Sequence, residues 1–224
     1  MEKGGPNRIP RWLPLLEAAG VFLLIMLYIW RLQARFPPFV VAIFALVVAS
    51  HRRHKETLAT LGFGRLNLRR CAAVLAVPVL SLSLILLTVG ATVGTIRSIS
   101  PLQGTLFLFT YFPWGLFQQY VLNGYFLNRL RAALPGSRGA PLLAALLFAT
   151  AHAPNWFLMC VTLVAGYVCA LLYTRYRNLY VLGLAHGAIG FLIYLVVPDS
   201  ITHHMFVGPR YWRALVASAG DVGS

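Results

Sequence analysis

Long apolar runs separated by short polar or basic connections form the dominant pattern of this chain. A membrane-spanning helix needs about 20 predominantly apolar residues, and most of the runs reach or approach that length. The pattern predicts an all-α fold, a polytopic transmembrane helical bundle with about seven spans, one more or fewer. The expected spans cover residues 14–33, 36–50, 71–95, 102–127, 141–157, 158–174 and 179–197.

The connections between the runs are less regular than the runs themselves. The run at 36–50 is short for a full crossing and is predicted to be re-entrant or extended. The basic stretch 51–70 is expected to form a surface helix broken at Gly62 and Gly64. The expected organisation is one integral membrane domain over 1–224, with a basic cytoplasmic arm at 1–13 and a C-terminal tail without a clear span at 198–224.

Composition excludes an ordinary soluble domain. Hydrophobic residues make up 59% of the chain, charged residues only 11%, and the mean hydropathy is +0.74. Soluble domains are roughly 45–50% apolar and about 25% charged. The net charge of +14 could indicate nucleic-acid binding, but the basic residues lie between apolar runs rather than on one face. We therefore predict no nucleic-acid partner and, instead, contact with a bilayer that has anionic headgroups.

Lysine and arginine residues are distributed unevenly between the two sides of the predicted membrane. Fourteen of the 19 lie on the side of the N-terminal arm, and five lie on the opposite side. Cytoplasmic connections carry an excess of these residues, so the N-terminus is predicted to be cytoplasmic in an integral protein of the plasma (inner) membrane. The five residues on the opposite side are Arg31, Arg35, Arg97, Arg210 and Arg213.

Five polar residues are expected at similar depth on three predicted spans. Gln118, Gln119 and Asn123 share roughly one helical face of the fourth span. His152 precedes a proline that should break the fifth span, and His186 lies about two turns into the seventh. Polar groups at membrane depth are costly unless partnered, so this set is the candidate site. Hydrogen bonding between helices without chemistry is the alternative interpretation.

Two kinds of cofactor site are alternative interpretations of these histidines. Zinc needs three protein ligands, and the two site histidines would need Asp199, His203 or His204 from a tail that folds back. A haem between the two site histidines would leave the amide pair unexplained. No cofactor is expected, and a metal is possible but not favoured. Asn155, just after the proline, is expected to cap a helix rather than to join the site.

Three motifs in this order resemble the CAAX protease and bacteriocin-processing family (CPBP or Abi) of intramembrane endopeptidases. The family's Glu-Glu-x-x-x-Arg motif is aligned with Gln118-Gln119-Tyr120-Val121-Leu122-Asn123. Its Phe-x-x-x-His motif is intact from Phe148 to His152. Its third motif keeps the histidine at His186, with Gly190 in place of the amide. The resemblance covers roughly residues 58–197, which we take as a family-like core.

The resemblance implies processing of a membrane-associated peptide or protein by water attack in a membrane-embedded polar cavity. In the family, the first glutamate is the general base, and the histidines and terminal amide hold water and stabilise the oxyanion. Carried over, Gln118 occupies the base position, Gln119 the second acid, and Asn123 the arginine. His152 and His186 match directly. The catalytic candidates are therefore His152, His186, Gln118, Gln119 and Asn123.

The replacements leave two functions open. In an enzyme, an imidazole would act as base in place of the glutamate, with His152 taking the proton of water while the glutamines orient it. Glu17 in the first span is a weaker candidate, because it lies near a membrane end where water would solvate it. In a catalytically weak or inactive member, the same cavity would bind or escort a membrane peptide, because glutamine is a good hydrogen-bond partner and a poor base.

Overall fold

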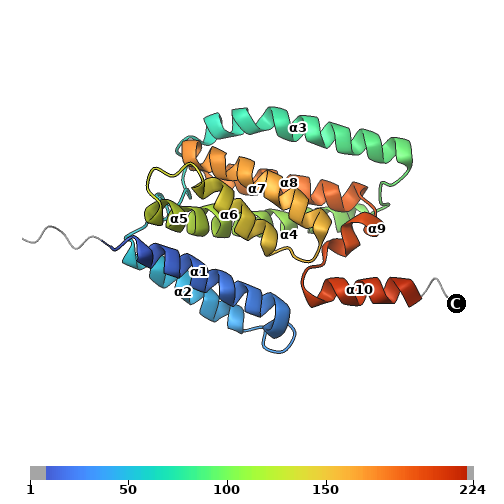
Figure 1. The fold of residues 1–224 in the computed structure, drawn as a ribbon. Helices are drawn as coiled ribbons and strands as arrows, with labels where there is room; N and C mark the ends of the chain where they lie inside the picture. The colour runs from blue at the N-terminus through green and yellow to red at the C-terminus, as the bar shows by residue number, and fades with distance from the viewer. Residues whose placement is uncertain (1–8, 221–224) are drawn as a thin grey trace, which may run out of the picture.

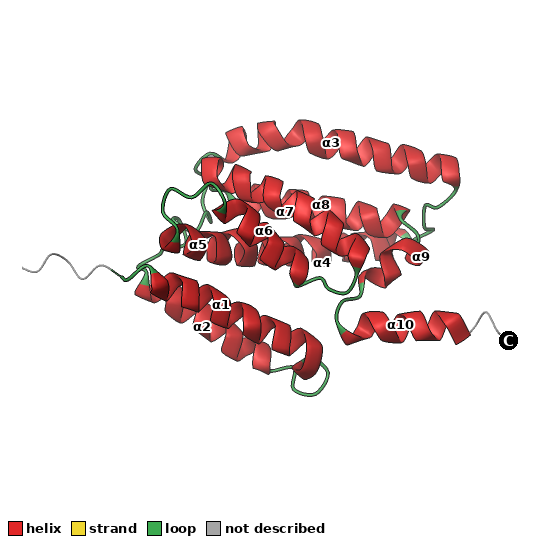
Figure 2. Cartoon of the chain, in the orientation of Figure 1, coloured by secondary structure: helices red, strands yellow, loops and turns green. Residues whose placement is uncertain are grey.

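The computed structural model describes residues 9–220, and these form an all-helical bundle without strands. Short turns join most of the helices, as Figure 2 shows. Along the chain the main helices are α1 (Trp12–Leu27), α2 (Phe39–Arg53), α3 (Leu68–Val93), α4 (Pro101–Gln119), α5 (Asn128–Ala133), α6 (Ala140–Thr150), α7 (Trp156–Tyr176), α8 (Leu179–Val196), α9 (Asp199–Thr202) and α10 (Pro209–Gly220). Two π-helical segments, η1 (Tyr28–Leu32) and η2 (Tyr120–Leu127), continue α1 and α4, and a 3₁₀ turn, η3 (His203–Met205), follows α9.

The long helices lie side by side and run in alternating directions (Figure 1). Helices α4, α6, α7 and α8 form the centre, with α3 along one side and the α1–α2 hairpin along the other (Figure 1). One end of the bundle carries the starts of α1, α3 and α8 together with α5, and we call it the basic end. The opposite end carries α9 and the start of α10 (Figure 1).

The predicted polytopic helical fold is confirmed, with different lengths for several spans. Four helices are long and apolar enough to cross a membrane: Trp12–Leu32, Leu68–Val93, Trp156–Tyr176 and Leu179–Val196. The run predicted at 141–157 is shorter as a helix, because α6 ends at Thr150. The span predicted at 102–127 is composite, since α4 passes into the π-helix η2 and then into α5.

The surface helix predicted within 51–70 is wrong. Helix α2 continues to Arg53, and turns follow as far as the start of α3. Gly62 has a φ of +92°, and a Cβ there would lie 2.8 Å from the carbonyl oxygen of Arg177. The side chain of Asn178 donates to the carbonyls of Gly64 and Leu66 at 2.9 and 3.1 Å. Packing against the α7–α8 turn thus replaces the helix.

The tail predicted from residue 198 onward is more ordered than expected. It forms α9, the 3₁₀ turn η3 and α10 within the described residues. Residues 1–8 of the predicted basic arm and residues 221–224 of the tail lie outside the described residues. The end of the arm, Trp12 and Leu13, already belongs to α1.

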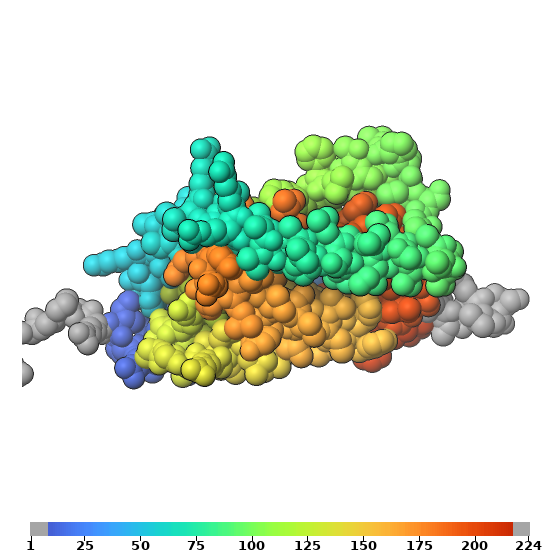
Figure 3. Space-filling model, turned by 90° about the horizontal axis from the view of Figure 1, so that it is seen from above, coloured from blue at the N-terminus to red at the C-terminus, as the bar shows by residue number. Residues whose placement is uncertain are grey.

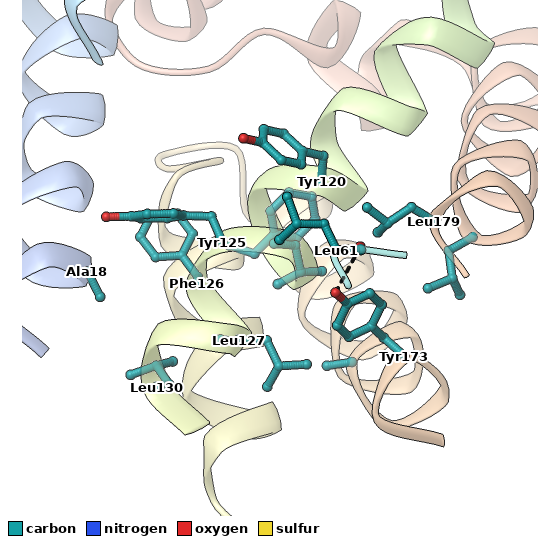
Figure 4. Close-up of a cluster of buried hydrophobic side chains, with 14 of the residues drawn as sticks. Ala18, Leu61, Tyr120, Tyr125, Phe126, Leu127, Leu130, Tyr173 and Leu179 are labelled. Atoms are coloured by element: carbon teal, nitrogen blue, oxygen red, sulfur yellow. Dashed lines mark hydrogen bonds between the residues drawn. The ribbon is translucent and has the colours of Figure 1, made fainter. Parts of the chain in front are cut away.

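The outer faces of the helices are apolar, as a bilayer requires. On α3, for example, Val77, Leu80 and Leu84 are each more than 60% exposed. The buried core lies instead between the hairpin, η2, α5 and α7, where aromatic and leucine side chains meet (Figure 4). In this core the hydroxyl of Tyr173 donates to the carbonyl of Leu61 at 2.9 Å, which ties the 54–67 segment to α7 (Figure 4).

Three glycines bring α4 and α8 into unusually close contact. A Cβ on Gly115 would lie 2.7 Å from the backbone of both Gly183 and Gly187. A Cβ on Gly183 would lie 2.7 Å from the Cα of Leu116, and one on Gly187 would lie 2.8 Å from the carbonyl oxygen of Tyr111. Small residues let membrane helices approach closely and gain van der Waals contact. This approach places the polar residues of α4 against those of α8.

Candidate functional site

A hydrogen-bonded chain of neutral groups links α4, η2 and α8. The Nδ2 of Asn123 donates to Oε1 of Gln119 at 2.7 Å, and Nε2 of Gln119 lies 3.0 Å from Nδ1 of His186. Gln119 is 1% exposed and Asn123 is fully buried. An amide nitrogen can only donate, so Nδ1 of His186 accepts and its proton lies on Nε2. His186 therefore presents a donor at its free nitrogen.

His152 is held in the opposite tautomer by its own motif. Its Nδ1 lies 2.7 Å from the carbonyl oxygen of Phe148. A carbonyl oxygen can only accept, so Nδ1 carries the proton and Nε2 keeps a free lone pair. The Phe148 ring packs edge-on against His152 at 4.8 Å and against His186 at 6.1 Å between ring centroids. One phenylalanine thus holds both histidines at the same site.

Gln118 is not joined to this network. Its side chain is half-buried and makes no hydrogen bond with any of the residues at 9–220. Four of the five predicted residues therefore lie together, namely Gln119, Asn123, His152 and His186, while the Gln118 side chain takes no part in the hydrogen-bond network. The Oδ1 of Asn123 is buried without a hydrogen-bond partner among the described residues.

The position of the family's terminal amide is filled by an aromatic ring. Gly190 lies one helical turn after His186 on α8, and a Cβ there would contact the Tyr111 ring at 3.4 Å. The Tyr111 side chain also packs against Phe191 and Tyr194 of α8. An apolar wall thus borders the site where the family motif has a hydrogen-bonding side chain.

The helix break predicted near Pro154 is present, but it begins before His152, which lies in the loop between α6 and α7 rather than on the fifth span. Helix α6 ends at Thr150, and the Oδ1 of Asn155 accepts from the backbone N–H of Leu158 at 3.1 Å, which caps α7. The Nδ2 of Asn155 donates to the carbonyls of Thr202 and Phe206 at 2.8 and 3.1 Å. Asn155 is therefore a capping residue that also ties the C-terminal segment to the loop of His152.

A second buried polar cluster lies on the same helical column, nearer the basic end, and sequence reasoning missed it. Arg129 of α5 is 1% exposed. It donates to the carboxylate of Glu56 and, through Nε, to the hydroxyl of Ser50 at 2.8 Å. Glu17 lies 3.6 Å from Nε of Arg129, and His51 lies 3.2 Å from its NH2 group. We call these five residues the ionic cluster.

Glu17 was expected to be solvated near a membrane end, and that expectation is wrong. Its carboxylate is only 11% exposed and accepts from Ser50, Arg53 and His54 at 2.8 to 2.9 Å. No contact joins it to the histidine site within the described residues. The sequence did contain a sign of this cluster, because residues 9–220 have only three acidic side chains among many basic ones. An acid that is buried needs a specific cation as its partner.

The same cluster changes the acidity of Glu56, which lies in the turn segment after α2. Burial raises the pKa of this carboxyl group, but hydrogen bonds from His51 and Arg129 outweigh burial and hold the pKa below its usual value. The Nδ1 of His51 lies 2.7 Å from the Glu56 carboxylate. Glu56 is therefore a paired anion and a poor candidate for a general base.

The acid of the C-terminal segment also has another partner. Asp199 forms two hydrogen bonds with Arg97, at 2.7 and 2.8 Å, and lies 3.1 Å from Nδ1 of His204. The hydrogen bonds from Arg97 hold the pKa of Asp199 below its ordinary value. Among residues 9–220 no group of three or more His, Cys, Asp and Glu side chains is arranged to hold a metal ion.

These features define a class: a polytopic helical membrane protein with a histidine–amide site inside the bundle. Residues 100–192 match the family described as Type II CAAX prenyl endopeptidase Rce1-like. The matched segment contains all five predicted site residues. The match over this segment confirms the resemblance drawn from the motifs. No curated protein and no solved structure matches the chain.

Proposed function

We propose that this protein is an intramembrane endopeptidase that cuts a membrane-associated peptide or protein, with His152 as the general base. The observation that carries the proposal is the pair of opposite tautomers at one site. His152 offers a free lone pair on Nε2, and His186 offers an N–H on Nε2. One group can take a proton from water while the other donates to the oxygen that becomes negative.

His152 supplies the proton acceptor because its backbone bond fixes the ring. The Phe148 carbonyl holds Nδ1–H, so that Nε2 is the only ring nitrogen able to accept a proton. A water molecule on this nitrogen would lose its proton as it attacks the substrate carbonyl carbon. The imidazolium that forms then protonates the leaving amine, which balances the hydrolysis.

His186 supplies the hydrogen bond to the developing oxyanion. Gln119 holds its Nδ1, and Asn123 in turn holds Gln119, so a buried amide pair orients this imidazole. Removal of one preorganised donor of this kind typically lowers the catalytic rate by about 10²–10³. Gln119 and Asn123 are therefore positioning residues, and Gln118 is left free to contact the substrate.

The second candidate function is binding without cleavage, and a specific observation favours it. Both polar ends of the Gln119 side chain are engaged by Asn123 and His186, and no carboxylate touches either histidine among the described residues. In this function the site would hold or escort a membrane peptide through hydrogen bonds. The two functions differ in one measurable result, the appearance of cut product.

The test is cleavage of candidate membrane peptides, including prenylated CAAX sequences, by the purified full-length protein. We expect His152→Ala to lower the rate by about 10²–10⁴, as loss of a general base does, and His186→Ala to lower it by about 10²–10³. His204→Ala, which removes an exposed histidine beyond α8, is the matched control and should leave the rate unchanged. Equal rates in all four proteins would contradict the proposed site.

Gln118→Glu separates the two functions. It restores a carboxylate at the family's base position on a side chain that is half-buried and unpartnered. A rise in hydrolysis would show that the scaffold is competent and that glutamine limits the rate. Tight peptide binding with no cleavage by either the wild type or Gln118→Glu would instead support the binding function.

The membrane orientation is part of the same proposal. Arginines and lysines gather at the basic end, so we place this end and the N-terminus in the cytoplasm of the plasma (inner) membrane. The partners are then the peptide substrate, which reaches the site through the bilayer, and anionic headgroups at the cytoplasmic surface. Labelling of single cysteines added near residues 65 and 97 from either side of sealed vesicles checks this orientation.

A further inference from the structure

The basic end carries a concave surface that the histidine site does not use. Two adjoining hollows of about 510 and 540 Å³ lie where the start of α3 meets the end of α7. Figure 3 shows the teal start of α3 lying directly beside the orange end of α7. The hollows are lined by Arg65, Asn67, Leu68, Arg69, Arg70, Ala73, Val74, Arg175 and Tyr176.

The charge of this surface is not neutralised within the protein. Arg65, Arg69 and Arg70 are exposed and make no ion pair with any residue that the structure describes. The two acids of this end, Glu17 and Glu56, are engaged in the ionic cluster. Arg175, the fourth cation, lies over the Tyr176 ring at 5.8 Å and makes no ion pair with any residue at 9–220. Four like charges therefore surround the adjoining hollows, where they are available to an external anion.

The backbone beneath the arginines is held in place. Asn178 donates to the carbonyls of Gly64 and Leu66, and Nδ2 of Asn67 donates to the carbonyl of Tyr176 at 3.2 Å. Asn67 has a φ of +56° and gives no side-chain cap to α3. The segment that carries Arg65 is therefore fixed against α7, so the arginines share one hollow before an anion arrives.

We propose that this hollow, the arginine hollow, binds the phosphate of an anionic phospholipid headgroup. Guanidinium groups form paired hydrogen bonds with phosphate oxygens, and basic pockets between membrane helices at the cytoplasmic side bind lipid headgroups. The apolar wall decides between a lipid and a free phosphate. Ala73 and Val74 continue the hollow along α3, where an acyl chain can lie, and Val77 extends this apolar strip.

The site is distinct from the histidine cluster and independent of proteolysis. It lies at the end of α3 and α7, whereas the histidines lie inside the bundle on α8 and the α6–α7 loop. Helix α3 packs mainly on α8, which carries His186. A bound lipid would therefore fix α3 against the family-like core from the outside.

The test uses the full-length protein in neutral detergent, titrated with phosphatidylglycerol or with phosphatidylcholine, with bound lipid counted by native mass spectrometry. We expect preference for phosphatidylglycerol and a loss of affinity of roughly tenfold or more in Arg69→Gln/Arg70→Gln, because each basic residue at a surface contributes several-fold. Arg131→Gln/Arg138→Gln removes two exposed arginines from the same end but outside the hollow, and should keep the preference.

Three results would overturn the assignment. Equal loss in the two double variants would mean general attraction of the basic end rather than a site. Equal binding of both lipids by the wild type would mean that the arginines do not select the headgroup. Displacement of phosphatidylglycerol by an equal concentration of inorganic phosphate would mean a free-phosphate site with no role for the acyl chain. Thermal unfolding of both variants in detergent checks that each is folded.

Discussion

The two buried polar clusters of this protein lie on the continuous segment formed by α4, η2 and α5. Both satisfy buried polar groups, one with neutral partners and the other with charged partners. Around Gln119 the partners are neutral amides and imidazoles, joined by hydrogen bonds of 2.7 and 3.0 Å. Around Arg129 the partners are two carboxylates, a serine hydroxyl and a histidine. The histidine site contains no carboxylate and no arginine among the described residues, while the ionic cluster contains both and pairs them.

The difference shows that charge is retained only where it can be compensated. An unpaired buried charge costs several kcal/mol, so a buried site is favourable when its charges are all paired or when it contains none. The replacement of two motif acids and one arginine by Gln118, Gln119 and Asn123 follows this rule. The ionic cluster follows it as well, because Arg129 has both Glu17 and Glu56 within ion-pair distance. The first cluster is suited to positioning groups, and the second joins the α1–α2 hairpin to the core.

The largest effect is expected from Arg129→Met. This change leaves Glu17 and Glu56 without their shared cation in a site that is nearly closed to solvent. Removing one partner of a buried ion pair typically costs about 3–5 kcal/mol. We expect a corresponding drop in the free energy of unfolding, measured by denaturant titration in detergent.

Arg131→Met is the matched control for this change. Arg131 lies on the same short helix but is exposed, so its loss should change stability by less than about 0.5 kcal/mol. A stability loss of the same size in both variants would show that the ionic cluster is not what anchors α5. The comparison of the two clusters would then lose its energetic basis.

Much of this architecture could be predicted from the sequence, and the reasons for success and failure are physical. The apolar runs predicted the helices because length and hydropathy alone decide what can cross a bilayer. The similar depth of these side chains on three predicted spans indicated that Gln119, Asn123, His152 and His186 would lie close together, because polar groups within a membrane need partners. The helix predicted within 51–70 failed because tertiary contacts of Gly62 and Asn178 override local propensity.

The ionic cluster could not be predicted in the same way. Its members come from α1, α2, the following turns and α5, so their sequence separation hides their contact. Glu17 and Arg129 are 112 positions apart and carry no motif. Gln118 is the opposite case, because its motif position predicted a place in the site but its side chain takes no part in the hydrogen-bond network. Spacing predicts which face a residue shares, but not which partner it finds.

A smaller effect is expected when a charged pair is put into the neutral cluster. Gln119→Glu alone places a carboxyl group beside Asn123 and His186 without a cation, and should destabilise the protein. Asn123→Arg alone buries an unpaired cation and should do the same. Combined, the two changes restore the family's acid–arginine pair, and we expect a favourable coupling of about 0.5–3 kcal/mol between them.

A double-mutant cycle on the free energy of unfolding measures this coupling. The matched cycle combines Gln118→Glu with Asn123→Arg, because Gln118 lies outside the network and should couple more weakly. Additive effects in the first cycle would show that α4 and η2 do not place residues 119 and 123 in a geometry that pairs an acid with an arginine. The neutral cluster would then differ from the acid–arginine motif in its geometry as well as in its charge.

The smallest expected effect is a difference between the two clusters in how the free energy of unfolding depends on pH. The pKa of Glu56 is held below its ordinary value of 4.5 by His51 and Arg129, so the unfolded chain takes up a proton before the folded protein does. The stability that this pairing supplies is complete above pH 4.5 and is lost as the pH falls through the folded-state value. Glu56→Gln should remove this part of the acid sensitivity, whereas Gln119→Leu, in the neutral cluster, should leave it in place. Unfolding titrations of the three proteins between pH 7 and 3 measure the difference, and parallel curves for wild type and Glu56→Gln would contradict the charge pairing that distinguishes the ionic cluster.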